Sequence, residues 1–204
     1  PVLLTPPMCT IDGTDVAPPP PLTDAAVVLT LQDGTTRTAE VVDGNGILAA
    51  IHATGCQEQM IVQQAPISFT DLRVETIDDR PITVGVLRVQ RGSADRPVSV
   101  LTAGGTIPFN LVFPAAPADG PLVTLAAGVA VVDLEVHFAE GRCDAHAVAE
   151  AKQPFRFVLQ LDLGDGVTRP LVVQPDPSLH AQMLATVAAG CAALGLDGTL
   201  QPEG

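Results

Sequence analysis

The residues best suited to chemistry lie in one short stretch, where Cys143 and Asp144 precede His146, Glu150 and Lys152. Asp144, His146 and Glu150 carry groups that bind metal ions, and His146 and Glu150 would share a face if this stretch were helical. Their spacing matches no specific zinc or copper motif. In the structural alternative, Asp144 caps the following turn, His146 bonds to the backbone, and Glu150 and Lys152 are solvated. We therefore treat the three as candidate binding residues and assign no metal or cofactor.

A second polar group, Asp133, Glu135 and His137, alternates with apolar residues along a predicted strand. These side chains would share one face of the strand and could bind a cation. A solvated strand face is the alternative, and we favour it. His52 and His180 fall on two predicted helices, where we expect them at the surface.

No pattern in the sequence indicates catalysis. Gly-x-Ser-x-Gly and Cys-x-x-Cys are absent, and Gly104-Gly105 lies between two predicted strands rather than between a strand and a phosphate-binding helix. We therefore expect that the protein is not an enzyme.

The composition excludes two classes of partner. The 204 residues carry 23 acidic and 10 basic side chains, a formal net charge of -13, which argues against binding nucleic acid or an anionic lipid surface. No apolar run reaches the ~18 residues of a membrane-spanning helix. Because the chain opens on an apolar segment without Met or a signal peptide, we expect an upstream piece that would carry any leader or membrane anchor.

The four cysteines mark an internal repeat. Cys9 and Cys56 are separated by almost the same length of chain as Cys143 and Cys191, and each pair encloses a strand, an Asp-Gly turn, a returning strand and a helix. A tandem duplication keeps each bridge inside one copy, so we predict disulfides Cys9–Cys56 and Cys143–Cys191.

Each predicted disulfide closes a long loop and would contribute roughly 4 kcal/mol to stability. The alternative is four buried free thiols in a cytosolic protein. Disulfides instead indicate an oxidising compartment, so we expect an extracytoplasmic protein, secreted or in the cell envelope.

Strand signals dominate the region between the repeats. Short β-type runs at 67–74, 82–89, 98–101, 107–113 and 131–138 predict a β-sandwich, and a change of apolar alternation predicts a bulge at 85–87. Helices are expected at 47–54, stopped by Gly55, and after a cap at Asp176, ending at Gly190.

We therefore predict a mainly β fold of tandem disulfide-stapled β-sandwich units of Ig-like type, each with one short helix near its C-terminal end. The units would span residues 1–64 and 65–204. The first has no equivalent of the leading strands of the second, so either the duplication is partial or those strands are missing. We favour missing strands, because a half-sandwich would expose a sheet edge.

The stretch from Cys143 to Lys152, a following Phe-rich strand and a helix ending in cysteine together resemble a group of exported actinobacterial proteins. Their pattern is similar to Cys-Asp-x-His-x-x-x-Glu-x-Lys, then a strand, an Asp-Gly turn and a closing cysteine. The resemblance covers about residues 55–191. It implies a location in the cell envelope, often behind a lipid or transmembrane anchor, and no assigned activity.

Three functions compete on these observations. We expect a non-catalytic accessory subunit or protein-binding module whose partner is another envelope or membrane protein, with residues 2–5 as a candidate docking edge. The alternative is a small-ligand or metal-binding protein that uses Asp144, His146 and Glu150. An enzyme with a pocket between the units is the third.

Overall fold

The computed structural model describes residues 9–12, 15–16, 26–40, 44–144, 146 and 150–196. The fold is mainly β, as predicted. The chain divides into two compact units, Pro1–Val62 and Gln63–Gly204.

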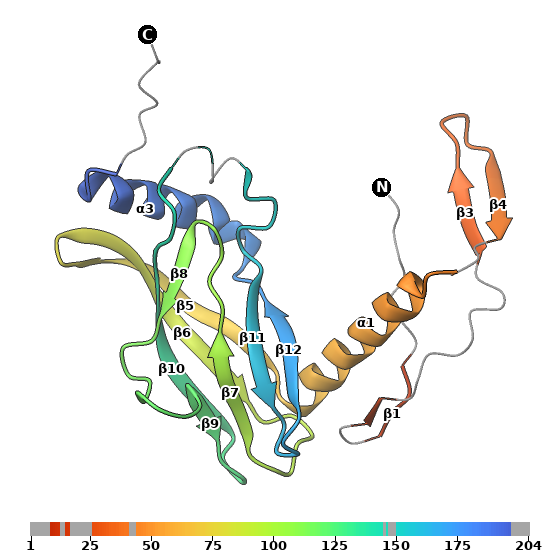
Figure 1. Cartoon of the computed structure of the whole chain (residues 1–204), viewed down its shortest axis with the longest axis horizontal. Helices are drawn as coiled ribbons and strands as arrows, with labels where there is room; N and C mark the ends of the chain where they lie inside the picture. The colour runs from red at the N-terminus through yellow and green to blue at the C-terminus, as the bar shows by residue number, and fades with distance from the viewer. Residues whose placement is uncertain are drawn as a thin grey trace. The chain divides into compact units, whose positions relative to one another are not determined.

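The second unit contains two four-stranded antiparallel sheets that stack as layers (Figure 1). One sheet has the order β5-β6-β10-β8, with strands Ile67–Ile77, Arg80–Gln90, Val131–Glu140 and Phe109–Val112. The other has the order β12-β11-β7-β9, with strands Thr168–Val173, Phe157–Asp162, Val98–Ala103 and Val123–Leu125. Alternation decides which side of each strand is buried: Phe157, Leu159 and Leu161 of β11 are fully buried, whereas Val158 between them is exposed.

Phenylalanine forms the centre of this core, although the chain has only six such residues. Five of them, Phe69, Phe109, Phe138, Phe155 and Phe157, contact one another. Phe69 and Phe138 meet edge to face with ring centroids 5.1 Å apart, a preferred geometry for aromatic pairs. The composition predicts an aliphatic core, but the few aromatic rings are concentrated where the two sheets meet.

The sheet irregularity lies in β5 and not in β6, which corrects the bulge predicted at 85–87. β6 pairs with β10 in unbroken register, whereas the pairing of β5 with β6 shifts between Thr70 and Arg73. Asp71, inside the bulge, has a φ of 54°, and a Cβ on the opposing Gly85 would overlap the Leu72 side chain. The glycine therefore marks the strand that faces the bulge.

A helix follows the last strand of the second unit. Asp176 accepts a hydrogen bond from the Ser178 backbone N–H at 2.8 Å, as expected of a cap, and a 3₁₀ turn η1 (Pro177–Leu179) leads into α3 (His180–Ala193). The helix continues through Gly190, where we expected it to end. Glycine lowers helix stability by only about 1 kcal/mol, which tertiary packing offsets when the position requires the missing side chain.

The described part of the first unit contains two hairpins and one long helix. The hairpins pair β1 (Ile11–Asp12) with β2 (Asp15–Val16), and β3 (Ala26–Thr30) with β4 (Thr36–Glu40). The helix α1 (Ile47–Gln64) runs through Gly55, so its predicted end at residue 54 is wrong. Buried residues Cys56, Met60 and Ile61 extend its apolar stripe past the glycine.

Several expectations on the first unit stay predictions. The docking edge at residues 2–5 lies outside the described residues. An Ig-like assignment and a tandem repeat of sandwiches go beyond the two hairpins and the helix described for this unit. Among the described residues, no helix is both long and apolar enough to cross a membrane.

Both predicted disulfides are present in the structure. Cys9 bonds to Cys56, and Cys143 bonds to Cys191, with Cα atoms 5.4 and 5.6 Å apart. Two such bridges are typical of proteins from oxidising, extracytoplasmic compartments.

Candidate functional site

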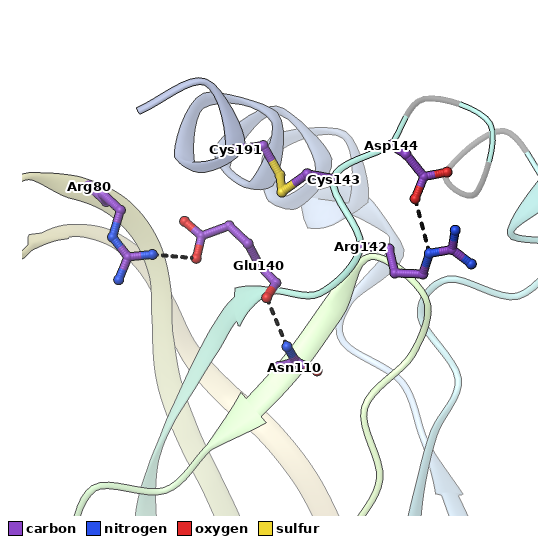
Figure 2. Close-up of a disulfide and its surroundings, with 7 residues drawn as sticks. All are labelled: Arg80, Asn110, Glu140, Arg142, Cys143, Asp144 and Cys191. Carbon is purple, nitrogen blue, oxygen red and sulfur yellow. Dashed lines mark hydrogen bonds and ion pairs between the residues drawn. A yellow bond between two sulfur atoms is a disulfide. The ribbon is translucent and has the colours of Figure 1, made fainter. Parts of the chain in front are cut away.

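The candidate binding residues follow the end of β10, beside the second disulfide. Figure 2 shows Glu140 at the end of this strand, Arg142 and Asp144 just beyond it, and Cys143 joined to Cys191 of α3. The neighbouring strand β8 supports this turn, because the Asn110 amide donates to the Glu140 carbonyl at 2.9 Å. The disulfide thus fixes the exit of β10 to the helix.

Glu140 is a buried carboxylate in this region. Its side chain is only 6% exposed, and Arg80 Nη1 donates to Oε2 at 2.9 Å. The other oxygen, Oε1, is buried without a hydrogen-bond partner and lies where a Cβ on Gly190 would be. Burial of an ion is unfavourable unless it is paired, so Arg80 and the missing side chain of Gly190 together make this placement possible.

An open surface depression of about 550 Å³ adjoins this turn. Its polar lining comes from Thr106, Asn110 and Arg142. The Thr106 hydroxyl donates to the Pro154 carbonyl at 2.8 Å, and the Arg142 guanidinium donates to Asp144 at 3.0 Å. These hydrogen bonds attach neighbouring loops to one another, so the depression lies where these loops meet.

The structure divides the three candidate ligands between different partners. Asp144 faces Arg142, while His146 Nε2 lies 3.4 Å from Glu150 Oε1. Both His146 and Glu150 are largely exposed. In the part of the chain that the structure describes, no three His, Cys, Asp or Glu side chains gather closely enough to hold a metal ion. The metal hypothesis therefore rests on the sequence alone.

The residues of the second candidate cation site, Asp133, Glu135 and His137, are likewise divided between different partners. Asp133 accepts two hydrogen bonds from Arg88, both at 2.8 Å, and Glu135 accepts from His137 at 2.8 Å. Hydrogen bonding to Arg88 lowers the pKa of Asp133 below its ordinary value of 3.8. Together with the pair of Arg73 and Glu75, these residues form what we term the charged face, the outer side of the sheet β5-β6-β10-β8.

Two histidines expected at the surface are half-buried. The His180 ring stacks on Phe155 with centroids 3.6 Å apart, and its Nε2 lies 3.2 Å from the Pro175 carbonyl. His52 lies one helical turn before Cys56, with Nδ1 3.6 Å from Sγ. The His180 ring therefore packs the start of α3 against Phe155, whereas the His52 ring lies along its own helix.

Sequence reasoning overlooked the outer side of the second sheet, which we term the uncharged face. The register places nine residues there, of which Asp162 is charged and eight are not: Ser99, Thr102, Thr124, Val158, Gln160, Thr168, Pro170 and Val172. The Asp162 carboxylate, at the end of this face, accepts hydrogen bonds from the backbone N–H groups of Gly164, Asp165 and Gly166, so its charge is directed into a turn. The sequence signal was the scarcity of charge at alternate positions of β7, β11 and β12, where Asp162 is the single charged residue.

Comparison of the chain with protein-family models, with curated proteins and with solved structures found no match. The geometry and chemistry of the described residues are therefore the basis of the functional argument.

Proposed function

We propose that this chain is a non-catalytic, extracytoplasmic protein of the cell envelope that acts as an accessory subunit or protein-binding module. Its partner is another envelope or membrane protein. The two disulfides support an oxidising location. The resemblance of residues 143–152 to exported actinobacterial proteins supports the same location. On this proposal, residues 1–64 and 65–204 are tandem Ig-like units.

The observation that carries the binding proposal is the contrast between the two outer sheet faces. Ion pairs such as Arg88–Asp133 cover the charged face, as expected of a surface that remains in water. Among the residues that the register places on the uncharged face, Asp162 alone is charged, although the whole chain carries a net charge of -13, and the Arg169–Asp165 pair of β12 lies on the other side of that strand. Depletion of charge distinguishes the centre of protein interfaces from other surface.

Two exposed valines on opposite sheets provide a matched test. Val158 on the uncharged face is 39% exposed, and Val112, paired with His137 on the charged face, is 46% exposed. We expect Val158→Asp to reduce recovery of the crosslinked partner by about tenfold, because docking would bury an unpaired carboxylate. Val112→Asp should leave recovery unchanged. The measurement is chemical crosslinking on intact source membranes, affinity capture of this chain and quantification of the co-captured protein.

Both variants should fold like the original chain, since each changes an exposed side chain, and circular dichroism checks this. A defined partner lost with Val158→Asp and kept with Val112→Asp would support the proposal. Recovery of the chain alone from intact membranes would contradict the subunit function. Equal losses in the two variants would contradict the choice of face.

A further inference from the structure

The disulfide Cys9–Cys56 of the first unit has a histidine beside one of its sulfur atoms. His52 lies one turn before Cys56 on α1, and its Nδ1 and Nε2 atoms are 3.6 and 3.8 Å from Cys56 Sγ. Whichever ring nitrogen carries a proton, it therefore lies close to this sulfur. A histidine next to a cysteine stabilises the thiolate form of that cysteine. The Cys56 sulfur is thus well placed to accept an electron pair when the bridge breaks.

The two cysteines of this bridge differ in burial. Cys56 is 0% exposed, whereas Cys9 is only half-buried. Thiol–disulfide exchange begins when a thiolate attacks one sulfur of a disulfide, and the other sulfur leaves as a thiolate. An incoming thiol therefore reaches Cys9, and Cys56 beside His52 is the leaving group. Burial and the position of the histidine select the same direction of attack.

The bridge Cys143–Cys191 has a similar pattern of burial but lacks the histidine. Cys191 is 5% exposed and Cys143 is half-buried, so attack would again release the cysteine of the helix. The residue one turn before Cys191 is Val187, an apolar residue. The Glu140 carboxylate lies against Gly190, the residue before Cys191, and Figure 2 shows it near this bridge.

Two features disfavour a thiolate at Cys191. The negative charge of Glu140 opposes a second negative charge nearby. Cys191 also lies in the last turn of α3, which ends at Ala193, where the helix dipole is negative. Cys56 instead lies near the middle of α1, away from either helix end. The chain thus contains two bridges of nearly equal loop length, of which the first has the better leaving group.

We infer that the bridge Cys9–Cys56 is a thiol–disulfide exchange site, at which a low-molecular-weight thiol forms a reversible adduct on Cys9 and His52 stabilises the released Cys56 thiolate. The thiol is small because Cys9 is half-buried. Exchange opens the covalent link between the residues that precede β1 and the helix α1. The site belongs to the first unit, whereas the uncharged face of the proposed function belongs to the second.

Each step of the exchange conserves atoms and electrons. The thiolate forms an S–S bond to Cys9 Sγ, the bond between Cys9 and Cys56 breaks, and its electron pair remains on Cys56 Sγ. The sulfur of the incoming thiol is oxidised and that of Cys56 is reduced. In the reverse step, the Cys56 thiolate attacks the adduct on Cys9, restores the bridge and releases the small thiol as a thiolate.

The test treats the folded full chain with 2-mercaptoethanol, an uncharged thiol whose approach the net charge of the protein does not oppose. Samples are then denatured in N-ethylmaleimide, which traps free thiols, and peptide mapping by mass spectrometry reads both bridges together. We expect the first bridge to react at least about tenfold faster than the second, because its leaving thiolate is better stabilised. The mercaptoethanol adduct should be on Cys9 and N-ethylmaleimide on Cys56.

Two substitutions separate the chemistry of His52 from its packing. His52→Gln keeps a polar side chain and removes the imidazole, so exchange at the first bridge should slow by about tenfold. His52→Lys supplies a positive charge and should restore most of the rate. The bridge Cys143–Cys191 is the internal control, and its rate should be the same in all three proteins.

Four results would overturn the inference. Faster exchange in His52→Gln would show that the histidine only protects the bridge by packing, and an unchanged rate would show that it has no influence on exchange. An adduct on Cys56 would contradict the direction of attack. A first bridge that reacts no faster than the second would contradict its selection. None of these results affects capture of a partner through the uncharged face, so the proposed function fails or stands separately.

Discussion

Glu140 shows how single residues depend on one another at the end of β10. One carboxylate oxygen pairs with Arg80, whose side chain is 25% exposed, and the other lies against Gly190. No side chain larger than hydrogen fits at position 190 unless Glu140 moves. The glycine in the helix thus maintains the position of an ion pair on the sheet.

Replacing Gly190 with alanine should change the free energy of unfolding in the opposite direction from the usual Gly→Ala change inside a helix. Gly→Ala inside a helix normally stabilises by about 1 kcal/mol, but Gly190→Ala should destabilise by about 1–3 kcal/mol because its methyl group displaces the buried carboxylate. Urea unfolding followed by circular dichroism measures this difference.

The control is the same change in a Glu140→Ala background. There the methyl group finds space, so Gly190→Ala should stabilise by about 1 kcal/mol. If the two backgrounds respond alike, the overlap with Glu140 does not determine the role of this glycine.

Paired aspartates should make stability depend on acid pH. Arg88 lowers the pKa of Asp133, and the Ser178 backbone N–H lowers that of Asp176, both from 3.8. A carboxyl whose pKa is lower when folded stabilises the protein above its unfolded pKa, and this contribution is lost as pH falls through the folded pKa. The free energy of unfolding should therefore decrease on acidification from about pH 5 to about pH 2.

Substitution separates the contribution of the Arg88–Asp133 pair. Asp133→Asn should make the decrease in unfolding free energy shallower, as should Arg88→Gln, and the double variant should add little to either. Urea unfolding at a series of pH values measures the slope. A slope unchanged by both single substitutions would show that the pair does not contribute to acid sensitivity.

Among the elements, the helices α1 and α3 are each attached to another part of the chain by a disulfide. The second disulfide joins the end of β10 to α3, and this helix also lies against β6 and β10. Its bridge encloses a loop with a sequence separation of 48, while the bridge of α1 has a separation of 47. The two bridges thus constrain loops of nearly equal length at different places in the chain.

Removal of the second bridge should act mainly on the sandwich. Cys143→Ser with Cys191→Ser should lower the unfolding free energy of the second unit by about 4 kcal/mol in the chain-entropy model. Hydrogen exchange of the β6 and β10 amides, followed by mass spectrometry, reports on this unit alone.

The other bridge provides the comparison. Cys9→Ser with Cys56→Ser should leave exchange in β6 and β10 unchanged, because neither cysteine belongs to the second unit. Equal acceleration of exchange in both double variants would show that the two bridges stabilise a common structure.

Across the whole molecule, the described surfaces differ in the groups they present. The sandwich has one charged and one largely uncharged outer face. The uncharged face is the region where contact with another protein would remove apolar groups from water with little desolvation of charge. The proposed binding function and its proposed surface follow from this distribution.

The sequence alone was sufficient for features that depend on nearby residues. Alternation predicted most strands of the sandwich, Asp-Gly predicted the hairpin turns, and Asp176 was recognised as a cap. The near-equal spacing of the two cysteine pairs was the basis for predicting both disulfides, which the structure contains. Each of these signals is contained within a short segment or repeated along the chain.

Features that depend on distant pairings required the folded chain. The end of α3 could not be read from Gly190, because the group that requires the glycine is Glu140. The bulge belongs to β5 although its sequence signal was Gly85 in β6, and the uncharged face exists only once β7, β11 and β12 lie side by side. Side chains far apart in sequence interact only after the sheets have formed, so no local pattern specifies which of them will meet.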